Sequence, residues 1–251
     1  STGHMIIVDD MLFQSKELFS PSVANTFKVV IQLGSILAVL VVFKDRFMNL
    51  LGLKKNITED QRLGDRLKLA QVIVGLLPAA VLGLLLEDFI DTYLFSVQTV
   101  LVGLVVGALL MIAADRFRPK RTTAETVDQM TYKQALGMGL FQCVALWPGF
   151  SRSGSTISGG VLLGLSHRAA SDFTFIMAVP VMMGASALSL FKNWEYITAA
   201  SLPFFIVGFI SAFIFALISI RFFLKLIQRI KLVPFALYRI VLAIVIYVLY
   251  F

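Results

Sequence analysis

The sequence is poor in charged residues, and it contains one cysteine and two tryptophans. Charged residues make up 15% of the 251 positions, against about 25% in an average soluble domain, while hydrophobic residues make up 58%. So little polar side-chain surface cannot cover a water-soluble globule of this length, which excludes an ordinary soluble protein. The single Cys143 excludes an internal disulfide, and its apolar surroundings indicate a small core residue.

The chain also lacks a basic face suited to nucleic acid, although its net charge is +7. Its lysines and arginines lie between apolar runs and are not interleaved with aromatic residues, so they indicate membrane topology and no nucleic-acid partner. No basic start of a signal peptide is present, and the first residue is Ser1, so we expect a processed or incompletely covered product.

Six apolar segments are long enough for spanning helices, which need about 20 residues. They are 27–43, 69–86, 97–114, 173–191, 202–220 and 234–251. Between the third and the fourth, residues 134–166 form two shorter apolar pieces separated by PGFSRSGST, which predicts a re-entrant helical hairpin. The sequence therefore predicts an all-α polytopic membrane protein, with residues 1–251 as a single integral membrane domain.

The distribution of lysine and arginine predicts the orientation of these helices. Loops 44–68, 115–133 and 221–233 are rich in both and should be cytoplasmic, whereas loops 87–96 and 192–201 are poor in them and should face outward. The hairpin must then enter and leave on the cytoplasmic side.

Each half of the chain places a short Ser/Gly motif before three spanning segments. The motifs are STGH at 1–4 and SRSGST at 151–156. Because three is odd, the second copy is inverted, which predicts repeat A at about 1–115 and inverted repeat B at about 130–251. Such repeats bind anions at their interface, but they also occur in transporters and lipid flippases, which are the alternative function class.

The segment WPGFSRSGSTISGG at 147–160 carries the strongest chemical signal. Arg152 costs about 2.5–3.5 kcal/mol at membrane depth, and a guanidinium can hold two phosphate oxygens at once. Hydroxyls and glycine backbone N–H groups surround it and suit a phosphate, namely Gly149, Ser151, Ser153, Gly154 and Thr156. The alternative is a small-residue packing segment in which Arg152 reaches the membrane surface.

Three further features have weaker interpretations. Ser1 lies three residues before His4, a spacing that suits a nucleophile and its base, although Gly-His-Met at a chain start also resembles a cloning remnant. His167 and Arg168 are expected at the cytoplasmic interface. Asp172 is expected to be a helix N-cap.

Several of these segments resemble one family over essentially the whole chain. They are STGHM at the start, IQLGSILAVL at 31–40, MTYKQALGMGLFQCVALWPGFSRSGSTISGG at 130–160 and the AVP and GA pairs within 178–185. The chain resembles bacterial undecaprenyl-diphosphate phosphatases of the bacitracin-resistance type. The resemblance implies an inner-membrane hydrolase that converts undecaprenyl diphosphate to undecaprenyl phosphate and inorganic phosphate, recycles the carrier lipid for peptidoglycan synthesis and confers bacitracin resistance.

The resemblance also implies roles for individual residues. The catalytic residues are Ser1 as nucleophile, His4 as its acid/base partner and Arg152 as the diphosphate clamp, although either Ser1 or His4 could attack. The substrate contacts are Thr2, Gly149, Ser151, Ser153, Gly154 and Thr156, in a cavity open toward the outer, periplasmic side.

A divalent cation, magnesium or calcium, is implied as the cofactor. In the family a glutamate-rich stretch before the serine–histidine motif supplies carboxylates that bind the metal or assist proton transfer. This sequence begins after that stretch, so no metal ligand is assigned. The implied partners are the undecaprenyl diphosphate substrate and membrane lipid, and a homodimer remains open.

Overall fold

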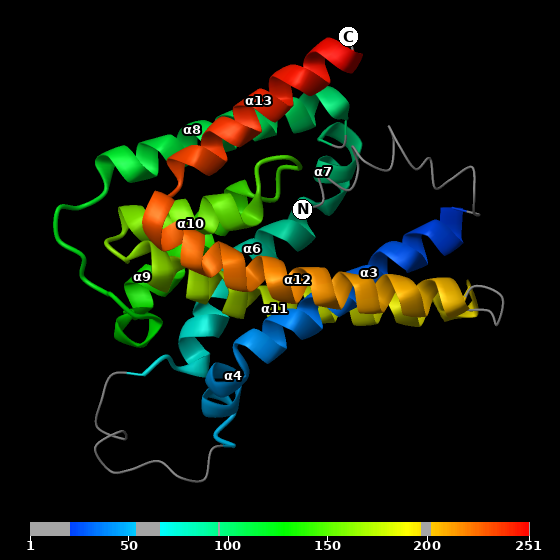
Figure 1. Ribbon diagram of the computed structural model, residues 1–251, viewed down its shortest axis with the longest axis horizontal. Coiled ribbons are helices and arrows are strands. Elements are labelled where there is room, and N and C mark those ends of the chain that lie inside the picture. Colours follow the sequence, from blue (N-terminus) through cyan, green and yellow to red (C-terminus); the bar gives the residue numbers. More distant parts are fainter. Residues whose placement is uncertain (1–20, 54–65, 95, 197–201, 251) are drawn as a thin grey trace. The chain divides into compact units, whose positions relative to one another are not determined.

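The computed structural model describes residues 21–53, 66–94, 96–196 and 202–250 (Figure 1). These residues form helices joined by loops, and their only β-type contact is an isolated bridge between Ala124 and Leu165. In chain order the helices are α3 (Pro21–Val42), α4 (Lys44–Leu50), α6 (Leu69–Leu85), α7 (Glu87–Tyr93), α8 (Val97–Phe117), η2 (Val127–Gln129), α9 (Tyr132–Val144), α10 (Arg152–Leu162), α11 (His167–Asn193), η3 (Trp194–Tyr196), α12 (Leu202–Ile230) and α13 (Val233–Tyr250).

All six predicted apolar segments are helices, namely α3, α6, α8, α11, α12 and α13. Among the described helices, α8, α11 and α12 have the length and composition to cross a membrane. Helices α3 and α4 add a fourth span if this pair, bent by 79°, is counted as one, while α6 and α13 are apolar but shorter. The all-α class with several membrane-compatible helices is confirmed, and six spans stay a prediction.

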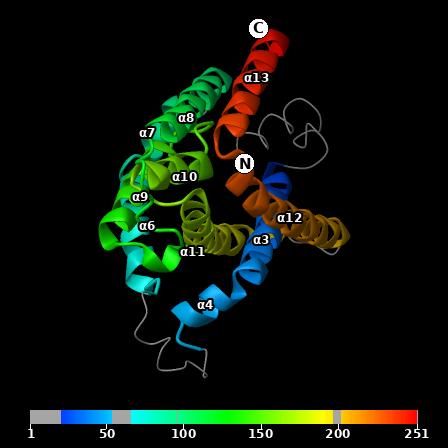
Figure 2. The same ribbon diagram turned by 60° about the vertical axis from the view of Figure 1, so that its left-hand side comes forward.

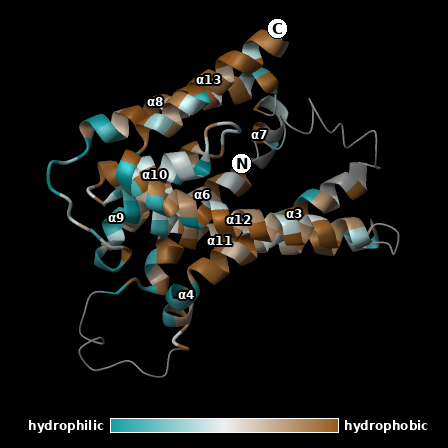
Figure 3. Ribbon diagram, in the orientation of Figure 1, coloured by the Kyte–Doolittle hydropathy of each residue, from teal (hydrophilic) through white to brown (hydrophobic). Residues whose placement is uncertain are grey.

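Apolar side chains cover the exposed surface of these helices as well as their packed faces. In α12, Val207 is 64% exposed, Phe215 70% and Phe222 63%. Figure 3 shows the hydrophobic colour along α8, α12 and α13, with hydrophilic residues gathered mainly at helix ends and in loops. An apolar surface of this extent is suited to lipid and not to water.

The contacts divide the chain into two compact units, which we describe separately. Among the described residues, the first unit holds 52–174 and 224–250, and the second holds 21–51 and 175–223. This division differs from the predicted halves 1–115 and 130–251, and the inverted repeat stays a prediction.

In the first unit, α9 and α10 form a hairpin that packs against α6 and α8, while α13 lies beside α8 (Figures 1 and 2). The two arms of the hairpin are antiparallel, because Gly160 lies against Met138 whereas Gly137 lies against Leu163. The predicted re-entrant shape of residues 134–166, two short helices around a break, is therefore present.

In the second unit, α3 and α12 pack closely and run in the same direction. The ring of Phe27 stacks on that of Phe204 with centroids 4.2 Å apart, and seven residues later Gly34 lies against the backbone of Phe209. A side chain at Gly34 would overlap that backbone, so the small residue sets the helix spacing.

Hydroxyl side chains cap the N-termini of several helices of the first unit. The hydroxyl of Ser96 accepts from Thr99 N at 3.2 Å, and that of Thr131 accepts from Gln134 N at 3.2 Å, as N-caps do. Ser166 caps α11 in the same way, accepting from Ala169 N at 3.0 Å. The prediction that Asp172 caps this helix is wrong, because α11 begins at His167 and Asp172 lies within it.

Candidate active site

The predicted phosphate-binding segment forms the tip of the hairpin, which we define as residues 145–151 between α9 and α10. A turn closes the tip, with Phe150 N donating to Trp147 O at 3.1 Å. The indole N–H of Trp147 donates to Thr99 O of α8 at 2.9 Å. These bonds fix the tip against the first turns of α8.

Glycine is required where the tip meets α8. Gly149 has φ +88°, a left-handed conformation that side chains disfavour, and a Cβ there would overlap the carbonyl of Val100. Across the contact, a Cβ at Gly103 would lie 2.6 Å from Pro148 O. The backbone of the tip therefore lies directly on the backbone of α8.

A buried arginine of α13 holds the tip from the same side. Arg239 is 6% exposed, and its Nη2 donates to Gly149 O at 2.7 Å, to Phe150 O at 2.8 Å and to Gly103 O at 3.3 Å. Its Nη1 lies 3.4 Å from the sulfur of Met111. One guanidinium thus binds two carbonyls of the tip and one of α8.

Sequence reasoning missed Arg239, although a signal was present. It is the only charged residue in the apolar segment 234–251, and an ionisable residue inside such a segment is a candidate functional residue. Its Nε is buried and has no hydrogen-bond partner among the described residues. Leaving this buried nitrogen without a partner costs free energy, and the carbonyl contacts of Nη2 hold the side chain in place nonetheless.

The tip passes into α10 at the residues predicted to bind phosphate. Ser151 is the N-cap with φ +75°, and its hydroxyl accepts from Gly154 N at 3.2 Å. Arg152 and Ser153 follow in the first turn, and both are half-buried. First-turn N–H groups lack intrahelical acceptors and carry the positive end of the helix dipole. Gly149, Ser151, Arg152, Ser153 and Gly154 are therefore brought together at a helix end that suits an anion.

Thr156 is placed differently from the other predicted contacts. It is fully buried; its hydroxyl donates to Arg152 O at 2.9 Å and accepts from the hydroxyl of Thr174 at 2.9 Å. The neighbouring Ser155 donates to the carbonyl of Phe141 in α9. Both hydroxyls are used in packing, so the geometry does not support Thr156 as a phosphate contact.

The remaining predicted catalytic groups cannot be placed. Ser1, Thr2 and His4 lie outside the described residues. Among the residues that the structure describes, no group of three or more His, Cys, Asp or Glu side chains could hold a metal ion.

A second polar cluster lies at the other end of the hairpin and is structural. The Nε2 of His167 lies 2.6 Å from Oδ1 of Asp115. Oδ2 of Asp115 accepts from Leu232 N at 2.8 Å and from Val233 N at 3.1 Å. Asp115 therefore caps α13 and ties it to α8 and α11, and His167 has a packing role.

Comparison with known proteins places the chain in a family. Residues 1–245 match the family described as bacitracin resistance protein BacA. The chain is 72% identical over 251 residues to the undecaprenyl-diphosphatase of Geobacillus sp. (strain WCH70), covering all of this chain and 91% of that protein. It is 65% identical over 245 residues to the undecaprenyl-diphosphatase of Bacillus subtilis (strain 168), covering 98% of this chain and 89% of that one. The chain belongs to the bacitracin resistance protein BacA family.

Proposed function

We propose that this protein is a membrane phosphatase that hydrolyses undecaprenyl diphosphate to undecaprenyl phosphate and inorganic phosphate. Its relatives at 65% to 72% identity are named undecaprenyl-diphosphatases, and its family is named for bacitracin resistance. The observation that carries the proposal is the start of α10, where Arg152 and two serines stand at a helix N-terminus fixed by buried contacts. A transporter or flippase is disfavoured, because the relatives are named as diphosphatases, which cleave a bond.

The helix end neutralises the charge of the diphosphate. The guanidinium of Arg152 binds two phosphate oxygens, and the hydroxyls of Ser151 and Ser153 with the first-turn N–H groups bind the others. Charge stabilisation of this kind accounts for most of the catalysis of phosphoryl transfer. The isoprenoid tail lies along the apolar surfaces of the helices.

The attacking group comes from the N-terminal motif. The hydroxyl of Ser1 attacks the terminal phosphorus, and its proton passes to His4. The bond from that phosphorus to the bridging oxygen breaks, undecaprenyl phosphate leaves, and water then releases the phosphate from the enzyme. If His4 attacks instead, the phosphoenzyme is acid-labile, whereas phosphoserine survives acid and is cleaved by alkali. Trapping radiolabelled phosphoenzyme and testing its stability distinguishes the two.

A divalent cation, magnesium or calcium, is part of the proposal. The described residues do not offer a ligand set for it, so no step is assigned to the ion here. Chelation with EDTA should abolish phosphate release, and added magnesium or calcium should restore it. Unchanged release after chelation would remove the cation from the proposal.

The proposed topology has six spans, a re-entrant hairpin, an inverted repeat and a site open toward the outer side of the inner membrane. Helix directions within each unit support it. Helices α8 and α13 are antiparallel, since Asp115 meets Leu232 whereas Gly103 meets Arg239. Helices α3 and α12 run in the same direction, as the predicted orientation requires.

Substitution at Arg152 tests the assignment. Arg152→Lys keeps the charge but loses the paired N–H donors of the guanidinium, and Arg152→Ala loses both. We therefore expect phosphate release to fall by about 10²-fold or more in each variant. Arg116→Ala, at an exposed position of the last turn of α8, is the matched control and should stay near the wild type. Near-normal turnover of Arg152→Ala in folded protein would overturn the clamp assignment.

A further inference from the structure

A basic pocket lies at the end of the hairpin opposite to the tip, within the first unit. Its volume is about 400 Å³, and four cationic side chains line it against one carboxylate, that of Glu125. The cations, which define the basic pocket, are Arg118, Lys120, Arg168 and Lys231. Val161, a lining residue of the pocket, lies nine residues after Arg152 in α10, about 13 Å along the helix, so the pocket is not part of the candidate active site.

Among the residues that the structure describes, carboxylates do not balance the positive charge of the basic pocket. Arg118, Lys120 and Lys231 form no ion pair with any described residue. Arg168 has only a marginal contact, with its Nε 4.0 Å from Oδ2 of Asp172, and its side chain is 62% exposed. An exposed pair at that distance contributes little, so all four cations are available to an anion.

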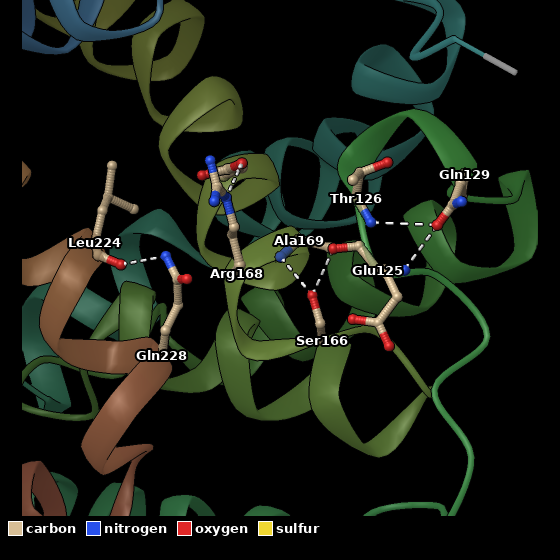
Figure 4. A network of polar contacts seen from close by, with 9 residues as sticks. Glu125, Thr126, Gln129, Ser166, Arg168, Ala169, Leu224 and Gln228 are labelled. Atoms are coloured by element: carbon tan, nitrogen blue, oxygen red, sulfur yellow. Dashed lines mark hydrogen bonds and ion pairs between the residues drawn. The ribbon is translucent and has the colours of Figure 1, made fainter. Parts of the chain in front are cut away.

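The wall of the basic pocket is preformed by hydrogen bonds. The hydroxyl of Ser166 donates to Glu125 O at 2.8 Å, and Gln129 Oε1 accepts from Glu125 N at 2.8 Å (Figure 4). Thr123 N also donates to Gly164 O at 2.8 Å. In Figure 4 the carboxylate of Glu125 points away from the guanidinium of Arg168. The loop after α8 is thus held against the start of α11.

The pocket is bordered by exposed apolar residues. Phe117, which precedes Arg118, is 75% exposed, and Ile230, which precedes Lys231, is 38% exposed. Apolar helix surface therefore ends where the cations begin, as it does at the level of lipid headgroups. The lysine and arginine distribution predicts that this end faces the cytoplasm, where membranes carry anionic lipids.

We infer that the basic pocket binds the phosphate group of an anionic membrane lipid. A cluster of four cations with one marginal ion pair, in a preformed pocket, recognises phosphate, and the apolar border places that phosphate on a lipid rather than free in water. The inference does not depend on the proposed hydrolysis, because the pocket lies outside the candidate active site.

Native mass spectrometry of the purified full chain tests this with phosphatidylglycerol as the probe and phosphatidylcholine as the uncharged comparison. The double variant Lys120→Gln with Lys231→Gln removes two pocket cations. The control, Lys133→Gln with Lys225→Gln, removes two exposed cations that do not line the pocket, one in the first turn of α9 and one near the end of α12. We expect phosphatidylglycerol to bind the pocket variant about tenfold or more weakly, and the control within about twofold of the wild type.

Three results would overturn the inference. Equal weakening in both double variants would indicate diffuse attraction, and unchanged binding in the pocket variant would indicate another site. Inorganic phosphate binding as tightly as phosphatidylglycerol would make it a free-anion site. Lys120→Gln alone, at an exposed loop position, gives a second variant that leaves the helices intact and should weaken binding about threefold.

Discussion

Arg239→Met is the substitution that most directly tests how the tip of the hairpin is held. Met fills a similar volume but cannot donate to the carbonyls of Gly149 and Phe150, which accept from Nη2 at 2.7 and 2.8 Å. Two charge-assisted bonds at about 1.5–3 kcal/mol each amount to about 3–6 kcal/mol, and removing a buried guanidinium recovers part of its desolvation cost. We expect a net loss of about 2–4 kcal/mol in the free energy of unfolding.

The single cysteine supplies the assay. Cys143 lies on α9, close to the tip, and is half-buried, so a dye that fluoresces on reaction with thiols reports opening of the hairpin. Arg239→Met should lower the melting temperature by several degrees and speed labelling of Cys143 below it. Val241→Ala, at a position 59% exposed on the same helix, is the control and should match the wild type.

The effect on catalysis separates positioning from general stability. Because Arg239 binds two carbonyls of the tip and its Nη1 lies beside Gly154 in the first turn of α10, its loss should lower turnover by about 100-fold through misplacement of donors in protein that is still folded. Arg239→Lys keeps the charge but lacks the paired N–H donors of a guanidinium, so it should recover only part of the lost turnover. If Arg239→Met melts, labels and turns over like the wild type, the guanidinium does not hold the tip.

The remaining predictions concern the same hairpin. Gly149→Ala should destabilise the protein by about 2 kcal/mol or more, because φ +88° and the carbonyl of Val100 leave no room for a methyl group. Gly184→Ala, which has no atom within 4 Å of the added Cβ, should be neutral or slightly stabilising in the same melt. Thr156→Val should cost about 1 kcal/mol in stability and leave KM for undecaprenyl diphosphate unchanged. A raised KM would instead restore Thr156 as a phosphate contact.

Hydropathy predicted the helices well, because it measures the apolar character of the side chains, which is the property that a membrane-spanning helix requires. It found the break between α9 and α10 because Pro148 and Gly149 interrupt two apolar pieces. Hydropathy located the ends of the helices less accurately. Helix α11 begins at His167 rather than 173, because the cap from Ser166 starts a polar first turn that apolar content does not detect. Helix α12 continues to Ile230 rather than 220, because a helix can carry charged residues once it leaves the apolar layer.

The candidate site was only partly predictable, since the motif is local but its support is not. Ser151, Arg152 and Ser153 follow one another in the sequence, so their grouping needs no tertiary information. The bond from Arg239 to Gly149 joins residues 90 positions apart, and no sequence spacing specifies it. Thr156 was assigned to phosphate because its hydroxyl lies near the motif in the sequence, whereas the helix turns that hydroxyl toward Thr174.

Arg239 contacts one side of the peptide unit that joins Phe150 to Ser151, and the start of α10 lies on the other side. All described peptide bonds are trans, so the C=O and N–H of each peptide unit point in opposite directions. The carbonyl of Phe150 points to Arg239, and the N–H of Ser151, which shares that peptide plane, therefore points away from α13. Arg239 thus sets the direction of the Ser151 N–H, which lies beside Arg152 in the candidate site. Under the proposed function, this buried guanidinium fixes donor geometry before substrate binds, as electrostatic preorganisation requires.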